Sequence, residues 1–247
     1  MVSAASDREL AAQAPPPSPV ERTFPRGVGP TAVELLVGYV VLTGLWVGLG
    51  LLLTGPLGSG ALVDFDQDVA TWFVDQRTPT LDTWANFGAM LADTLVKIIA
   101  TAVIAVIMFA LWRSLREPLM VALALVLEAS VFITTTWIVG RNRPDVERLE
   151  ESPVGSSFPS GHVAAAAAYA AVAIVIFERT RNVWIRSVTV VVVVALPVVV
   201  GIARMYQGMH FFTDVVAGVV LGAASVVVVY LIFRPGRDQQ IAASTPR

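Results

Sequence analysis

The 247-residue chain contains no cysteine, two histidines and a single lysine, and it carries little charge. The absence of cysteine excludes disulfide bonds and thiolate chemistry. Charged residues make up 15% of the chain, whereas a typical soluble protein has about 25%. The formal net charge of −2 provides no basic surplus that would favour nucleic acid. Composition therefore excludes an ordinary cytosolic enzyme and indicates no nucleic-acid partner.

Apolar residues make up 55% of the chain, before its 18 glycines are counted. A window of about 19 residues finds six apolar stretches, near residues 33–54, 92–112, 118–139, 162–177, 183–203 and 211–233. A helix of roughly 20 residues crosses a bilayer. The sequence therefore predicts an all-α integral membrane protein, with a six-helix bundle at residues 31–235. A disordered N-terminal tail at 1–30 and a C-terminal tail at 236–247 flank it.

Arginine is concentrated in the segments before the first stretch, between the second and third, between the fourth and fifth, and after the sixth. The positive-inside rule assigns such segments to the cytoplasm. We therefore expect a multi-pass protein of the cell membrane with both termini cytoplasmic. On the opposite side, residues 64–90 carry apolar residues at helical spacings around Pro79. This pattern predicts two short amphipathic helices on the outer interface, with a solvated loop as the alternative.

Ionisable residues gather at the outer ends of the predicted spans. His162 begins the fourth span and His210 begins the sixth, so both lie at one surface. Asp214 follows His210 by four residues, which on a helix brings the carboxylate within hydrogen-bonding reach of the imidazole. Three arginines follow or end spans at the same surface: Arg141, Arg143 and Arg204. A histidine oriented by an aspartate is a nucleophile, a second histidine is a general acid, and guanidiniums bind phosphate, so this set indicates phosphoryl transfer.

Residues 156–162 read S-S-F-P-S-G-H and directly precede or begin the fourth span. A Ser-Gly pair at a helix start provides a cap and exposes backbone N–H groups to an anion at the positive end of the helix. We expect Ser160 to donate its hydroxyl, and Gly161 its N–H, to a bound phosphate.

Three motifs together resemble those of the type 2 phosphatidic acid phosphatase (lipid phosphate phosphatase) superfamily. They are G-R-N-R-P at 140–144, P-S-G-H at 159–162 and A-R-M-Y-Q-G-M-H-F-F-T-D at 203–214. The resemblance implies a membrane phosphatase that needs no metal or other cofactor. In it, His210 forms a phosphohistidine, Asp214 orients that histidine, and His162 protonates the leaving group. The phosphate ligands that it implies are Arg143, Arg204, Ser160 and Gly161.

The chain departs from the family pattern at two positions. Ala203 replaces a serine of the third motif, and Thr136 replaces the lysine of the first. Lys97 is predicted at a similar depth below the outer surface, at about 1.5 Å per residue along a helix. We therefore expect Lys97 to supply the missing phosphate-binding cation, with Arg141 as the competing candidate.

The family resemblance offers undecaprenyl diphosphate, phosphatidic acid and phosphatidylglycerol phosphate as substrates, and an outward-facing site favours the first. The alternatives are a catalytically impaired family member and a proton-coupled anion transporter, for which Glu128 in the third span would carry the proton. His162, His210 and Asp214 also form a possible zinc set, but converging guanidiniums favour an anion. The expected partners are a lipid phosphate and the bilayer; the sequence does not indicate an oligomeric state.

Overall fold

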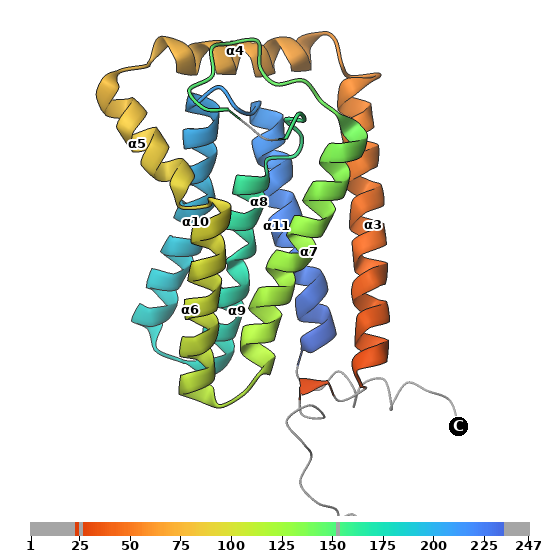
Figure 1. The fold of residues 1–247 in the computed structure, drawn as a ribbon. Helices are drawn as coiled ribbons and strands as arrows, with labels where there is room; N and C mark the ends of the chain where they lie inside the picture. The colour runs from red at the N-terminus through yellow and green to blue at the C-terminus, as the bar shows by residue number, and fades with distance from the viewer. Residues whose placement is uncertain (1–22, 25–26, 152–153, 235–247) are drawn as a thin grey trace, which may run out of the picture.

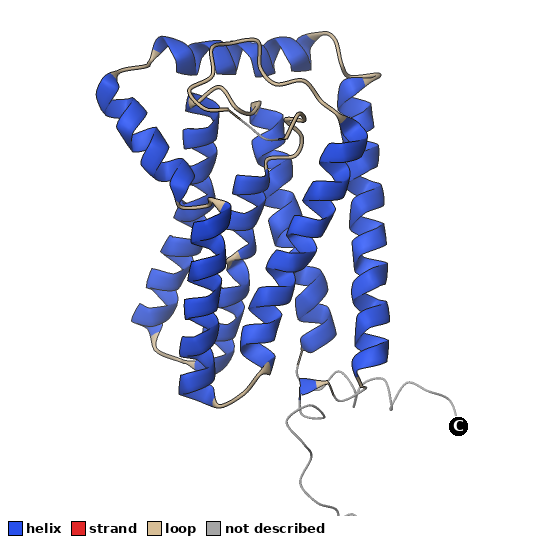
Figure 2. Cartoon of the chain, in the orientation of Figure 1, coloured by secondary structure: helices blue, strands red, loops and turns tan. Residues whose placement is uncertain are grey.

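The structure is a computed structural model that describes residues 23–24, 27–151 and 154–234. The predicted C-terminal tail at 236–247 and most of the predicted N-terminal tail at 1–30 lie outside these residues. Within the described part, helices joined by loops account for the whole fold, and no strand is present (Figure 2). The all-α prediction is confirmed.

Six helical segments are long and apolar enough to cross a membrane. They are α3 (Val28–Thr54), α6 (Thr94–Trp112), α7 (Arg116–Val139), the consecutive pair α8 (Gly161–Ala168) and α9 (Ala170–Arg179), α10 (Val183–Tyr206) and α11 (Phe212–Phe233). The start of α3 and the end of α11 lie at the same end of the bundle (Figure 1). The protein is thus an integral membrane six-helix bundle, as the sequence predicted.

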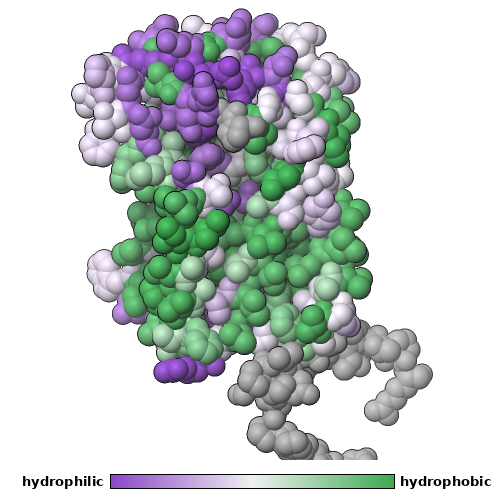
Figure 3. All heavy atoms as spheres, in the orientation of Figure 1, coloured by the Kyte–Doolittle hydropathy of each residue, from purple (hydrophilic) through white to green (hydrophobic). Residues whose placement is uncertain are grey.

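The spans divide into a central and a peripheral group. In the apolar segments of α7, of α8 with α9 and of α11, 44–50% of the residues are buried, compared with 6–17% in α3, α6 and α10. The exposed side chains of the peripheral helices are large and apolar, including Val106 of α6 and Val191 of α10. They form the broad hydrophobic belt seen on the molecular surface in Figure 3. Such a belt is energetically acceptable only against lipid.

The close approach of α8 and α11 sets the position of the site. A Cβ atom on Gly218 of α11 would lie 2.6 Å from the carbonyl oxygen of Ser160, immediately before α8. Glycine is therefore required for this contact. The Ser160 N–H also donates to the Asp214 carbonyl in the first turn of α11, so the starts of α8 and α11 lie at the same end of the bundle.

Two short helices cover this end of the bundle: α4 (Ala61–Asp75) and α5 (Pro79–Met90) (Figure 1). Pro79 occupies the first turn of α5, where its missing N–H costs nothing, and the Thr78 hydroxyl caps the helix by accepting from the Leu81 N–H. Trp72 and Trp84 are exposed on these helices, as expected of aromatic residues at a membrane interface. The prediction of two interfacial helices is confirmed.

The end of α10 differs from the hydropathy prediction. The helix continues to Tyr206 rather than ending near residue 203, because its last turn is covered by protein instead of lipid. The Tyr206 hydroxyl donates to Asp82 Oδ1 of α5 at 2.7 Å. Arg77, between α4 and α5, donates to the Tyr206 carbonyl. Hydropathy averages underestimate the length of a span whose polar end is packed beneath other helices, here α4 and α5.

Candidate active site

The predicted histidines lie together beneath the outer layer, at the ends of different helices. His162 is in the first turn of α8, and His210 is in the short link between α10 and α11. The described parts of the loop between α7 and α8, residues 140–151 and 154–160, fold over the same end of the bundle and contribute Arg143. This loop begins at Gly140, whose φ of 60° ends α7 in a left-handed conformation that favours glycine. Burial at this end therefore comes from α4, α5 and one long loop.

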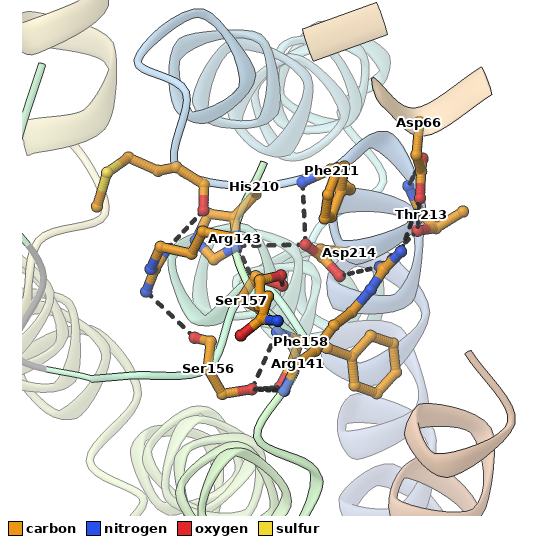
Figure 4. Close-up of polar contacts among 12 residues, drawn as sticks. Asp66, Arg141, Arg143, Ser156, Ser157, Phe158, His210, Phe211, Thr213 and Asp214 are labelled. Carbon is orange, nitrogen blue, oxygen red and sulfur yellow. Dashed lines mark hydrogen bonds and ion pairs between the residues drawn. The ribbon is translucent and has the colours of Figure 1, made fainter. Parts of the chain in front are cut away.

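His210 is 5% exposed, and its ring orientation is fixed by a backbone carbonyl. The imidazole Nδ1 lies 2.7 Å from the carbonyl oxygen of Ser157 (Figure 4). A carbonyl can only accept a hydrogen bond, so Nδ1 carries the proton and the lone pair is on Nε2. This tautomer is the one that a nucleophilic histidine needs.

The prediction that Asp214 holds His210 by a hydrogen bond across one helix face was wrong in its geometry. His210 precedes α11, whereas Asp214 is in its first turn. The Asp214 carboxylate lies 3.9 Å from His210 Nδ1 and accepts instead from the Phe211 backbone N–H at 2.9 Å. Asp214 therefore acts on the imidazole through its charge, while the Ser157 carbonyl orients the ring (Figure 4).

Burial and neighbouring cations keep His210 neutral. Desolvation is the largest cause, followed by the positive charges of Arg204 and Arg143, and together they lower the pKa of His210 well below its ordinary value of 6.5. At neutral pH the ring is therefore uncharged. A neutral imidazole with a free Nε2 can attack an electrophile.

Arg143 is anchored through neutral backbone oxygens. Its guanidinium donates to the carbonyls of Met209 and Val154 at 2.5 and 3.1 Å. It also donates to the Ser156 carbonyl at 3.1 Å (Figure 4). Burial, followed by the charge of Arg204, lowers the pKa of Arg143 to about 10. The side chain is still charged at neutral pH, and these bonds tie the α7–α8 loop to the backbone beside His210.

A cavity of about 210 Å³ opens beside His162 and Arg204. Residues from α5 and from the loops on either side complete its lining: Asn86, Ala89, Met90, Asp93, Glu150 and Gln207. Arg204 is 3% exposed and donates to Glu150 Oε2 at 2.5 Å and to Gln207 Oε1 at 2.9 Å. A carboxylate from the loop thus occupies one donor of the Arg204 guanidinium. We refer to this space as the Arg204 cavity.

Ser160 and Gly161 lie at the start of α8, as predicted. Ser160 is fully buried, and its hydroxyl has no hydrogen-bond partner among the described residues, while its backbone N–H donates to the Asp214 carbonyl. A Cβ on Gly161 would come within 2.7 Å of the Phe132 ring. Glycine at this position lets α8 begin in contact with α7. The roles of both residues toward phosphate stay predictions.

The two candidates for the missing motif cation have different surroundings. Lys97 lies in the first turn of α6 and is not part of the lining of the Arg204 cavity. Its charge acts on both His162 and Glu128, so its contribution to the site remains a prediction. Glu128 itself is fully buried in α7, and neither carboxylate oxygen has a hydrogen-bond partner among the described residues.

Arg141 does not take the role that the sequence suggested. Its guanidinium binds Asp214 Oδ1 at 2.5 Å, Asp66 Oδ2 at 2.9 Å and the Thr213 hydroxyl at 2.8 Å (Figure 4). It also lies over the Phe211 ring, 4.5 Å from the centroid. Two carboxylates already pair with this cation. We therefore correct the hypothesis that Arg141 binds phosphate, and describe Arg141 as a buried structural cation.

Three residues of the site were missed from the sequence. Asp66 had a detectable signal, since an acid at helical spacing from Val69 and Phe73 lies on the apolar face of α4. Ser157 contributes its backbone carbonyl, which no residue-type pattern reveals. Glu150 lies in an acidic loop, where carboxylates are common and carry no spacing signal.

The alternative zinc set is not assembled. Among the residues that the structure describes, no three His, Cys, Asp or Glu side chains are arranged to hold a metal ion. The polar groups gathered here are instead the imidazoles of His162 and His210, with the guanidiniums of Arg143 and Arg204 close by. Such a site complements an anion.

Comparisons with known proteins agree with this architecture. The family model of the PAP2 superfamily matches residues 118–237. The fold is similar to that of a transmembrane PAP2-type phosphatidylglycerolphosphate phosphatase from Bacillus subtilis, with a TM-score of 0.67, 23% identity, and coverage of 85% of this chain and 96% of that one. It is also similar to Aquifex aeolicus LpxE, with a TM-score of 0.50, 23% identity, and coverage of 66% and 92%. No curated protein sequence matched.

The match covers all three motifs, which supply the histidines and arginines just described. The chain is a membrane-integral protein whose residues 118–237 match the PAP2 superfamily.

Proposed function

We propose that the protein is a metal-independent lipid phosphate phosphatase that acts through a phosphohistidine at the outer membrane surface. The observation that carries this proposal is the state of His210, a buried neutral imidazole whose Nδ1 is held by the Ser157 carbonyl. That bond leaves Nε2 to attack, and Arg143 and Arg204 supply positive charge beside it.

The first half of the proposed reaction transfers the phosphoryl group to the enzyme. Arg143 and Arg204 bind the phosphoryl oxygens, with the Ser160 hydroxyl and the Gly161 N–H completing the pocket. His210 Nε2 then forms a bond to phosphorus while the bond from phosphorus to the leaving oxygen breaks. The negative charge of the bound phosphate favours the protonated form of His162, which gives its proton to that oxygen.

The second half returns the enzyme to its starting state. His162, now neutral, removes a proton from water, and the water oxygen attacks the phosphohistidine. The bond between phosphorus and Nε2 breaks, inorganic phosphate leaves, and His162 is again protonated. Asp214 stabilises the positive charge that the His210 ring carries in the intermediate, because the ring keeps its proton on Nδ1.

The substrate class is a lipid with a phosphate or diphosphate headgroup. The Arg204 cavity is lined in part by α5, and α5 lies with α4 at the polar end of the molecule, above the apolar belt (Figures 1 and 3). A headgroup at this depth leaves its hydrocarbon tail in the bilayer. A site at the outer leaflet favours undecaprenyl diphosphate. Phosphatidic acid and phosphatidylglycerol phosphate are the other candidates, and the similarity to the Bacillus subtilis phosphatidylglycerolphosphate phosphatase supports the latter.

Phosphate release by the purified protein in detergent tests this function. We expect turnover on at least one of the three lipids and no turnover from His210→Ala. Wild type given a radiolabelled substrate should form an acid-labile phosphoenzyme.

His162→Ala should retain reaction with an activated substrate such as p-nitrophenyl phosphate, because a good leaving group needs no proton. Vanadate should inhibit strongly. Failure of wild type on all three lipids would support the transporter or an impaired enzyme instead.

A further inference from the structure

A buried carboxylate from α4 contacts the start of α11, outside the lining of the Arg204 cavity. Asp66 belongs to α4, yet it is 0% exposed. It accepts hydrogen bonds from the backbone N–H of Thr213 at 3.1 Å and from the Thr213 hydroxyl at 2.5 Å, at the start of α11. Its second partner is Arg141, at 2.9 Å. None of the three motifs includes Asp66.

The guanidinium of Arg141 lies between two buried carboxylates. One of its terminal nitrogens binds Asp66 and the other binds Asp214 (Figure 4). All three side chains are at most 7% exposed, so water screens their charges poorly. The group carries two negative charges and one positive charge, which leaves a net charge of −1 beside His210.

This net charge matters because His210 becomes positively charged during the proposed reaction. The charged groups acting on its ring are the cations Arg143 and Arg204, the imidazole of His162, and the carboxylate of Asp214. Asp214 is the negative member of this set. If Arg141 were paired with Asp214 alone, that pair would be neutral and would offset little of the charge of a phosphohistidine.

We propose that Asp66 is a positioning residue for the phosphatase reaction: it binds Arg141 and so keeps the negative charge of Asp214 available to His210. This inference rests on the proposed function. Asp66 touches neither the histidines nor the Arg204 cavity, and it therefore acts through Arg141 and through Thr213.

Asp66→Asn is the informative substitution, because the amide keeps the size of the side chain and an oxygen that can accept from Thr213. Phosphoryl transfer should slow, with kcat reduced on the order of tenfold. This corresponds to a loss of about 1.4 kcal/mol from the attraction between Asp214 and the charged His210 ring. KM should stay within about twofold, because binding depends on Arg143 and Arg204. Asp68→Asn, at an exposed position of the same helix, is the matched control and should behave as wild type.

A second substitution separates the charge effect from a loosened α4. Arg141→Gln alone leaves two buried carboxylates without their cation and should be more damaging than Asp66→Asn. The double variant Asp66→Asn with Arg141→Gln again has a net charge of −1 on Asp214, and its kcat should recover several-fold over Asp66→Asn. A purely structural role for Asp66 predicts the reverse, since the double variant has lost more buried bonds.

The outcomes distinguish this inference from the proposed function. If wild type releases phosphate and His210→Ala does not, the proposed function stands and the variants test Asp66. Unchanged kcat in Asp66→Asn, or a double variant slower than Asp66→Asn, overturns the inference alone. Absence of a phosphoenzyme in an active wild type overturns both, because no charged His210 intermediate would then need Asp214.

Discussion

Glu150 occupies the guanidinium on which the proposed mechanism relies for phosphate binding, so it should compete with the substrate. The two groups are 2.5 Å apart, with the Arg204 side chain 4% exposed and that of Glu150 46% exposed. A phosphate that binds Arg204 must displace the carboxylate. Replacing Glu150 with Gln removes the competing charge and should therefore strengthen binding.

The size of this effect follows from the exposure of the pair. Solvent-exposed ion pairs contribute about 0.2–1 kcal/mol, and the burial of Arg204 places this one near the upper end of that range. About 1 kcal/mol corresponds to about a fivefold change in affinity. We therefore expect Glu150→Gln to lower KM for a lipid phosphate, and the inhibition constant of inorganic phosphate, by about two- to fivefold.

Steady-state kinetics on detergent-solubilised protein measures both constants. Glu151→Gln is the matched control, because it removes a neighbouring exposed carboxylate from the same loop. A shared decrease in both variants would reflect general loop charge and not the bond to Arg204. A higher KM in Glu150→Gln would refute the reasoning, since it would mean that the carboxylate assists binding.

Three further expectations concern pH, the buried acid and the start of α8. The pKa of His210 is lowered below 6.5 in the folded protein, so the unfolded chain takes up the proton more readily. The free energy of unfolding should therefore fall as pH drops below about 6.5. Thermal unfolding between about pH 7.5 and about pH 5.5 measures this dependence, and His210→Gln should reduce it. Glu128→Gln should leave phosphate release within about twofold of wild type, whereas an essential proton carrier would be inactivated. Gly161→Ala should destabilise the fold by about 1–3 kcal/mol through overpacking against Phe132, and an unchanged melting temperature would show that the ring moves aside.

The membrane architecture could be predicted because it depends on local averages. Six apolar segments of sufficient length determine the spans, and helical spacing around Pro79 determines α4 and α5. The mutual arrangement of His210 and Asp214 could not be predicted in the same way. It depends on where α11 begins: the helix starts at Phe212, so His210 lies two residues before it. A shift of two residues decides whether the carboxylate bonds to the ring or to the Phe211 backbone.

The three arginines of the site show why residue type alone did not assign their roles. Arg143 donates to carbonyl oxygens, which are neutral, so these bonds leave its charge in place for an anion. Arg204 binds the half-exposed carboxylate of Glu150, which an incoming phosphate can displace into water. Arg141 binds two fully buried carboxylates that have no access to solvent. Separating Arg141 from these carboxylates would leave uncompensated buried charges. Arg141 therefore balances Asp66 and Asp214, although it lies only two residues from Arg143 in the chain.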